Sequence, residues 1–154
     1  MLGNGPLEGG CACGKVRYVL RHTGGMQPYA CHCRDCQTRS GSAAMVNLHI
    51  SLDQFEIRGE LIDAEVAKPN GSSVTQHACP ACLTRIYSSS KSRPGTGILR
   101  AGTLDASDLL EPAVHLWTSR KQPWVTLPEG VRTFETQPDN PLEWIGLLRP
   151  ETGS

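Results

Sequence analysis

The sequence predicts an all-β domain made of many short strands, and two observations support this prediction. Gly (16 residues) and Pro (11 residues) are frequent among the 154 residues, and they divide the chain into pieces that suit strands and turns better than long helices. Between these breaks apolar and polar side chains alternate, most clearly over residues 46–52. Alternation of this kind places one face of a strand against a core. The length fits a single domain.

The expected elements follow in chain order. Strands are expected over residues 15–20, 46–52, 55–58, 61–68, 74–77, 85–88, 98–101 and 114–118. A turn is expected at residues 52–54, a polar loop over 88–97, and single helical turns within 37–42 and 105–110. Residues 1–8 are expected to form a flexible arm and residues 127–154 a Pro-rich wrap or tail. The folded domain would then occupy residues 9–126.

Charge and hydropathy exclude several classes of partner. The formal net charge is zero and no long run of like charges occurs, so neither a nucleic acid nor an anionic membrane is an expected partner. No apolar stretch approaches the roughly 20 residues that a membrane span needs. The first residues have no basic segment followed by an apolar one, so we expect no signal peptide and a cytoplasmic location. Thiols stay reduced in that compartment.

Three of the seven cysteines occur within six residues, in the stretch Cys31-His32-Cys33-Arg34-Asp35-Cys36. Reduced, closely spaced cysteines are typical of metal ligands. Three thiolates can hold a zinc ion and leave one of its four tetrahedral positions open, as catalytic zinc sites do. Cys31, Cys33 and Cys36 are therefore the candidate catalytic residues.

The other four cysteines form a second set. Cys11 and Cys13 stand between glycines near the start of the chain, and Cys79 and Cys82 form a C-x2-C pair between two expected strands. Four thiolates close the coordination of a zinc ion, and closed sites are structural. A division of seven cysteines into four and three predicts two zinc ions per chain, one of which fastens distant segments together.

Other interpretations of these residues stay open at this point. A histidine could close the three-cysteine site, and the candidates are His22, His32, His49, His77 and His115. The C-x2-C pair could be a redox pair, although such pairs usually precede a helix and a strand pattern follows here. Arg34 and Arg39 are either solvated or favourably placed beside an anionic zinc–thiolate group. Trp117 and Trp124 belong either to the core or to the wall of a pocket.

The motifs resemble those of the glutathione-dependent formaldehyde-activating enzyme family, which includes centromere-protein-V-like proteins. The matching segments, in the family's order, are residues 9–18, 31–36, 40–42, 79–82, 101–105, 115–117 and 123–124. The resemblance implies an Mss4-like fold of several short coiled antiparallel sheets built around zinc knuckles. It also implies a structural zinc on Cys11, Cys13, Cys79 and Cys82 and a catalytic zinc on Cys31, Cys33 and Cys36.

The function implied by the resemblance is that of a zinc-dependent carbon–sulfur lyase. The family's named activity joins or splits glutathione and formaldehyde as S-(hydroxymethyl)glutathione. The resemblance therefore implies a small thiol as the substrate, and glutathione is the thiol that the family uses. The alternative is a non-catalytic Mss4-like zinc-binding module that engages a protein partner. Two departures stand out, because the family usually has an aromatic residue where this chain has Ala78 and a glycine where it has Leu83.

Overall fold

The computed structural model of the chain describes residues 2–149, without the side chains of residues 141–143. Its strands are β1 (Leu7–Gly10), β2 (Arg17–Leu20), β3 (Tyr29–Cys31), β4 (Met45–Ser51), β5 (Phe55–Arg58), β6 (Ile62–Ala67), β7 (Ser73–Ala78), β8 (Arg85–Ser89), β9 (Thr96–Arg100), β10 (Val114–Leu116) and β11 (Arg132–Thr133). Its helices are α1 (Arg34–Ser40) and α2 (Pro141–Leu147), with 3-10 turns η1 (Leu52–Gln54), η2 (Ala101–Thr103), η3 (Ser107–Leu109) and η4 (Thr118–Arg120).

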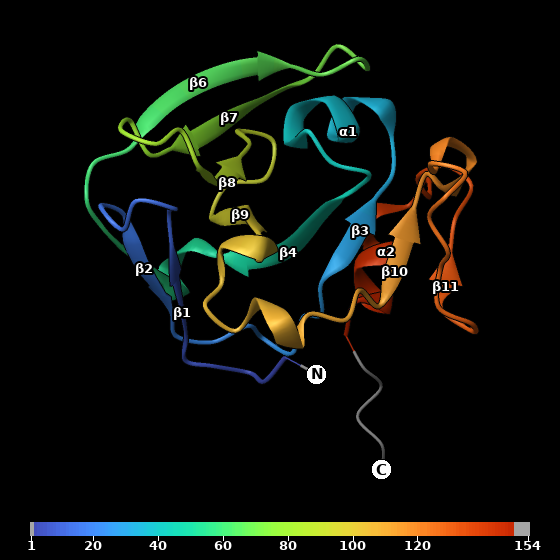
Figure 1. Cartoon of the computed structure of the whole chain (residues 1–154), viewed down its shortest axis with the longest axis horizontal. Coiled ribbons are helices and arrows are strands. Elements are labelled where there is room, and N and C mark those ends of the chain that lie inside the picture. The colour runs from blue at the N-terminus through green and yellow to red at the C-terminus, as the bar shows by residue number, and fades with distance from the viewer. Residues whose placement is uncertain (1, 150–154) are drawn as a thin grey trace.

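The strands of residues 2–149 form two sheets, which confirms the all-β prediction. One is a three-stranded antiparallel sheet in the order β1-β2-β5, and the other has eight strands in the order β11-β10-β3-β4-β9-β8-β7-β6. Figure 1 shows the first sheet beside the curved array of β6 to β9, with α1 above β4 and with β10 and β11 at the opposite side. The core lies between the sheets and includes the fully buried side chains of Val16, Leu20, Leu48, Ile86 and Leu99.

The sheets are not purely antiparallel, in contrast to the antiparallel sheets that the family resemblance implies. β10 pairs in parallel with β3, Leu116 opposite Cys31, and in parallel with β11. Parallel neighbours need a long connection between them, and here the whole segment from α1 to η3 supplies it. The consequence is that β10 lies directly beside the strand that ends at Cys31.

The first sheet begins earlier than the expected boundary at residue 9. Leu7 to Gly10 pairs with Leu20 to Arg17, and Leu2 is only 4 % exposed. A Cβ atom on Gly9 would collide with Tyr18 Oη and with the carbonyl oxygen of Thr103. The two glycines of this segment therefore permit a close backbone approach that propensity alone would not reveal.

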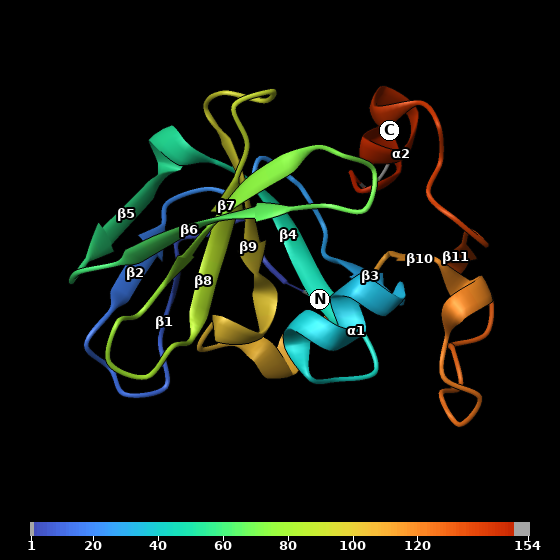
Figure 2. The same cartoon turned by 90° about the horizontal axis from the view of Figure 1, so that it is seen from above.

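The described part of the C-terminal segment contains a strand and a helix that pack against the body. Trp144 of α2 is 3 % exposed and makes an edge contact with Tyr29, at 4.9 Å between ring centroids. Leu148 is completely buried. Figure 2 shows α2 beside β10 and β11 and apart from the first sheet. Both α-helices have seven residues, and no helix within residues 2–149 meets the length and apolarity needed to cross a bilayer.

Helix α1 begins within the cysteine stretch and differs from the single helical turn expected within residues 37–42. It begins three residues earlier, at Arg34, because Cys33 is its N-cap and the Cys33 Sγ atom accepts the backbone N–H of Cys36 at 3.3 Å. It ends at Ser40, and its C-cap Gly41 has a φ of 66°, the left-handed conformation that favours glycine. The expected strands are present; β5 has the expected boundaries, and the boundaries of the others differ by at most two residues.

Candidate metal centres

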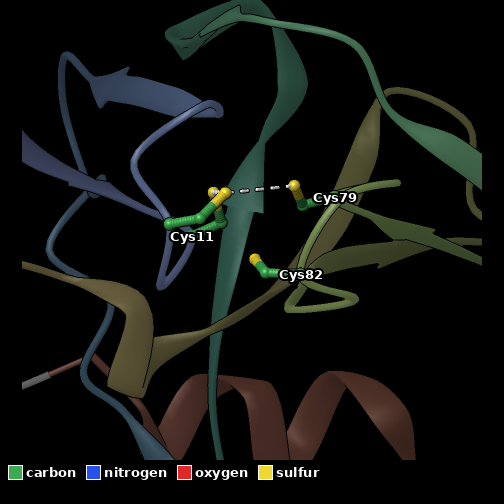
Figure 3. Close-up of side chains that lie close together, drawn as sticks. Cys11, Cys79 and Cys82 are labelled. Atoms are coloured by element: carbon green, nitrogen blue, oxygen red, sulfur yellow. Dashed lines mark hydrogen bonds between the residues drawn. The ribbon is translucent and has the colours of Figure 1, made fainter.

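The structure brings Cys11, Cys13, Cys79 and Cys82 together, as the spacing of the cysteines predicts. Their sulfur atoms all lie within 4.8 Å of one another. Cys13 Sγ lies 3.5 Å from Cys11 Sγ and 3.8 Å from Cys79 Sγ. Figure 3 shows the sulfur atoms of Cys11, Cys79 and Cys82 turned toward a common centre from two separate segments. Zinc–sulfur bonds of about 2.3 Å place the corners of a tetrahedron about 3.8 Å apart, so the four thiols fit a zinc ion.

Backbone and hydroxyl groups surround these sulfur atoms with hydrogen-bond donors. The backbone N–H of Val16 donates to Cys11 Sγ at 3.2 Å. A hydrogen bond from the Thr84 hydroxyl, at 3.1 Å, lowers the pKa of the Cys82 thiol to about 5. The same hydroxyl oxygen accepts the backbone N–H of Ala12 at 3.2 Å. Donors of this kind favour the thiolate form, which is the form that binds metal.

The position of this four-cysteine cluster explains what a metal ion there would stabilise. Cys11 and Cys13 follow β1 of the three-stranded sheet, whereas Cys79 and Cys82 lie in the turn between β7 and β8 of the eight-stranded sheet. An ion bound by all four would therefore link the two sheets, in addition to the core between them.

The second cluster consists of Cys31, Cys33 and Cys36, and its sulfur atoms also lie within 4.8 Å of one another. Cys31 is the last residue of β3, Cys33 caps α1, and Cys36 lies in the first turn of that helix. A strand end followed by a helix start folds the three side chains back onto one point. All three are local in sequence, so this cluster closes no long loop.

The pKa values of Cys31, Cys33 and Cys36 indicate that their cluster is suited to binding a cation. Hydrogen bonds from the thiols of Cys31 and Cys36 lower the pKa of Cys33 to about 2. The contact with Cys33 raises the pKa of Cys31 to about 11, and the contacts with Cys31 and Cys33 raise that of Cys36. Alone, the cluster thus favours one thiolate and two thiols, because three adjacent negative charges repel one another. A cation bound there would allow all three to ionise, and the donor set fits a zinc ion.

No histidine or carboxylate within residues 2–149 joins this group of three sulfur atoms. His32 lies between two of the cysteines in sequence, but its side chain points toward β10. Its Nε2 atom shares a hydrogen bond of 2.9 Å with His115 Nδ1, and the two rings are stacked. Burial lowers the pKa of both histidines, so both are neutral at physiological pH. The pair attaches the cysteine loop to β10.

Gln37 is a second anchor of the loop, and the sequence pattern does not single it out. Its Nε2 atom donates to the carbonyl oxygen of His32 at 2.7 Å and to that of Arg120 at 2.9 Å. Its Oε1 atom accepts from Gln122 at 2.7 Å and from Arg34 at 3.3 Å. Gln37 is 6 % exposed, so it fixes the cysteine loop against residues 115–122 from a buried position.

Arg39, Trp117 and Trp124, which the sequence pattern also singles out, lie in different parts of the structure. Arg39 donates to both carboxylate oxygens of Asp35, at 3.0 and 2.9 Å, and lines a cavity beside α1. Trp117 packs against the core with a φ of 58°, which ends β10, whereas Trp124 is 74 % exposed.

Two cavities lie at opposite ends of β4. One, of about 510 Å³, is lined by Met45 and by residues of α1, β8 and β9, next to the three-cysteine cluster. The other, of about 570 Å³, is lined by His49 and by Ile145 of α2. None of the seven cysteines lines either cavity, but Met45 stands opposite Cys31 in the sheet and Arg39 follows Cys36 on α1, so the first cavity adjoins the three-cysteine cluster.

Comparison with known proteins agrees with the arrangement of the cysteines. Residues 6–120 match the sequence profile of the family described as "Glutathione-dependent formaldehyde-activating enzyme". A Halomonas elongata protein, provisionally named a glutathione-dependent formaldehyde-activating enzyme, is 32 % identical over an alignment 161 positions long that covers 96 % of this chain and 99 % of that protein. A crystal structure of a Rhodobacter sphaeroides protein covers 69 % of this chain and 97 % of its own, with a TM-score of 0.50 and 18 % identity. That last similarity concerns the fold alone.

Proposed function

Because the chain belongs to the glutathione-dependent formaldehyde-activating enzyme family, we propose that it joins and splits a small thiol and formaldehyde as a carbon–sulfur lyase, with Cys31, Cys33 and Cys36 as the reaction site. In the forward direction the thiol sulfur forms a bond to the carbonyl carbon. The electron pair of the C=O double bond moves to the oxygen, which takes up the proton that the thiol loses. The product is an S-hydroxymethyl adduct, and the reverse reaction returns both reactants.

The observation that supports this proposal is the composition of the three-cysteine cluster. The sulfur atoms of the three thiols lie within 4.8 Å of one another, and no fourth possible ligand from the described residues belongs to the group. We propose that these thiols hold a zinc ion with one open position. A zinc ion in such a site supplies a positive charge that lowers the pKa of an entering thiol and polarises an aldehyde oxygen.

The protein's own part is to hold the loop in place. The His32 and His115 pair ties the loop to β10, and Gln37 ties it to the carbonyl oxygen of Arg120. Because these contacts are buried, they keep the three sulfur atoms in a fixed relation to the neighbouring cavity. For Cys11, Cys13, Cys79 and Cys82 we propose a closed, structural zinc, which gives two zinc ions per chain. We also propose a cytoplasmic location, where the thiols would stay reduced.

The experiment that tests this proposal is an exchange measurement by NMR. Formaldehyde and glutathione equilibrate with their adduct, and the exchange rate is measured with and without the zinc-loaded protein. The wild type is expected to raise the rate above the uncatalysed value, and Cys33→Ala to abolish the increase. A Cys33→Ala variant that is as active as the wild type would contradict the assignment of the site. No acceleration by the wild type would contradict the reaction.

A further inference from the structure

The cavity next to the three-cysteine cluster is lined by three arginines. It holds about 510 Å³, within the range of small-molecule sites, and Arg39, Arg85 and Arg100 line it together with Met45, Val46 and Leu83. We call it the arginine pocket. No aspartate or glutamate of residues 2–149 is among the residues that line it.

The arginine pocket and the three-cysteine cluster share their supporting elements. Arg39 lies one helical turn after Cys36 on α1, so the two side chains emerge from neighbouring positions of the same helix. Met45 of β4 stands directly opposite Cys31 of β3 in the sheet. Opposed residues of paired strands have Cα atoms about 4.5–5.5 Å apart. A ligand in the pocket is therefore a neighbour of the thiols.

Arg100 is held rigidly across the pocket. Its Nη1 atom donates to Asn47 Oδ1 at 2.8 Å, and its Nη2 atom donates to Gln76 Oε1 at 3.1 Å. Both acceptors are buried amides, so they fix the guanidinium group without neutralising its charge. Its Nε atom is buried and has no hydrogen-bond partner within residues 2–149. A buried donor without a partner is costly, so the fold keeps a guanidinium group with an unsatisfied N–H beside the pocket.

Arg85 carries a second positive charge that no described carboxylate offsets. Its Nη1 atom is buried and, like Arg100 Nε, makes no hydrogen bond to the part of the chain that the structure describes. Arg39 is different, because its charge is paired with Asp35. The pocket therefore presents two guanidinium groups that have no carboxylate partner among residues 2–149, and a planar guanidinium group is suited to bidentate binding of a carboxylate.

We infer that Arg85 and Arg100 bind a carboxylate of the substrate, so that this protein selects thiols that carry a carboxylate close to the sulfur. This inference rests on the proposed reaction at the cysteines. In glutathione the glycine carboxylate lies one residue beyond the cysteine, within about 7 Å of its sulfur, since each residue of extended chain spans about 3.5 Å. The apolar side chains of Met45, Val46 and Leu83 would then cover the carbon atoms between the two ends.

A ligand that cannot react separates this inference from the proposed function. S-methylglutathione keeps both carboxylates but has no free thiol, and its binding to the zinc-loaded protein is measured by calorimetry at low ionic strength. The wild type is expected to bind it at least about tenfold more tightly than its diethyl ester. Arg85→Gln is expected to weaken binding of the free acid by about tenfold or more, and Arg85→Lys to restore part of the loss.

Arg58→Gln is the matched control, because Arg58 is exposed on β5 and lies outside the pocket. It should bind the free acid as the wild type does, and both glutamine variants should keep the wild-type melting temperature within a few degrees. Equal affinities of Arg85→Gln and wild type, or of acid and ester, would overturn the inference even if thiol–formaldehyde exchange is accelerated. A strong preference for the acid without accelerated exchange would support the pocket and contradict only the reaction.

Discussion

Cys13 Sγ lies 3.8 Å from Cys79 Sγ, although 66 residues separate them in the sequence. This contact joins the three-stranded sheet to the turn between β7 and β8, so a metal ion there would stabilise the fold as a whole. Cys79→Ala is therefore expected to lower the melting temperature by at least about 10 °C, or to give insoluble protein. Cys33→Ala removes one sulfur atom of the local three-cysteine cluster and the N-cap of α1, which costs about 1 kcal/mol and a few degrees. Thermal unfolding of both variants is the measurement, and equal melting temperatures would be inconsistent with the two roles.

Metal analysis of the same proteins gives an independent result. Freshly purified wild type is expected to contain about two zinc ions per chain, and a chelator should remove the ion of the three-cysteine cluster first, because three thiolates hold metal less firmly than four. Cys33→Ala should retain about one. A wild type with a single ion that survives Cys33→Ala but not Cys79→Ala would leave one structural site and no reaction site.

Gln37 is expected to be important for the three-cysteine cluster although it binds no metal. Gln37→Leu nearly conserves the volume but leaves the carbonyl oxygens of His32 and Arg120 without their donor. The expected loss is about 2–3 kcal/mol in the free energy of unfolding, together with faster chelation of the ion from this cluster. Gln137→Leu, at an exposed position, is the control and should change neither quantity. An unchanged chelation rate in Gln37→Leu would show that the loop does not depend on this anchor.

The parts of the fold that sequence reasoning predicts correctly are those that local pattern determines. Alternation over residues 46–52 identifies β4, and the spacing of Cys79 and Cys82 identifies the turn between β7 and β8. β1 escapes prediction because its Gly9 and Gly10 have no strand propensity; Gly9 permits the close approach of Tyr18, and Gly10 that of the Val16 carbonyl oxygen. α2 escapes because prolines dominate the composition around it, whereas Trp144 is held by its contacts with Tyr29 and His49.

The candidate site likewise has one part that the sequence predicts and another that it does not. The two groups of cysteines follow from spacing, since ligands to one ion must be close together. The arginine pocket does not, because Arg39, Arg85 and Arg100 come from α1, β8 and β9, and only the strand order brings them together. The use of His32 as a link to His115 rather than as a ligand depends likewise on the parallel pairing of β3 and β10.

Leu83 occupies a position that favours glycine. Its φ is 63°, its side chain is 67 % exposed, and its backbone N–H closes the turn onto the carbonyl oxygen of Cys79 at 2.9 Å. The left-handed conformation costs a residue with a Cβ atom about 1–2 kcal/mol, and the greater chain entropy of glycine offsets part of the gain. Leu83→Gly is expected to raise the melting temperature by about 1–4 °C. Leu83→Ala keeps the Cβ atom and should give no increase, and an equal increase in both variants would refute the explanation.

His49 predicts a specific pH dependence of stability. Burial, together with the charge of Arg93, lowers its pKa to about 4, whereas the unfolded chain takes up the proton near pH 6.5. The unfolded state thus binds more protons between these values, so stability falls as the pH decreases from 6.5 to 4, by about 3 kcal/mol in total. His49→Phe keeps the ring contacts with Tyr29 and Trp144 and removes the titration. Denaturant unfolding at several pH values should show a smaller loss in this variant; parallel curves would exclude His49 as the source.

The most direct test of the reaction site is a thiol titration of the cobalt-substituted protein. Cobalt replaces zinc in thiolate sites and makes its ligands visible by absorption. With an open position at Cys31, Cys33 and Cys36, glutathione and mercaptoethanol should both intensify the thiolate-to-cobalt bands. Cys33→Ala should lose this response, while the bands of the four-cysteine cluster stay unchanged. If neither thiol alters the wild-type spectrum at millimolar concentration, the cluster is closed, and a non-catalytic zinc-binding module is the better description of the protein.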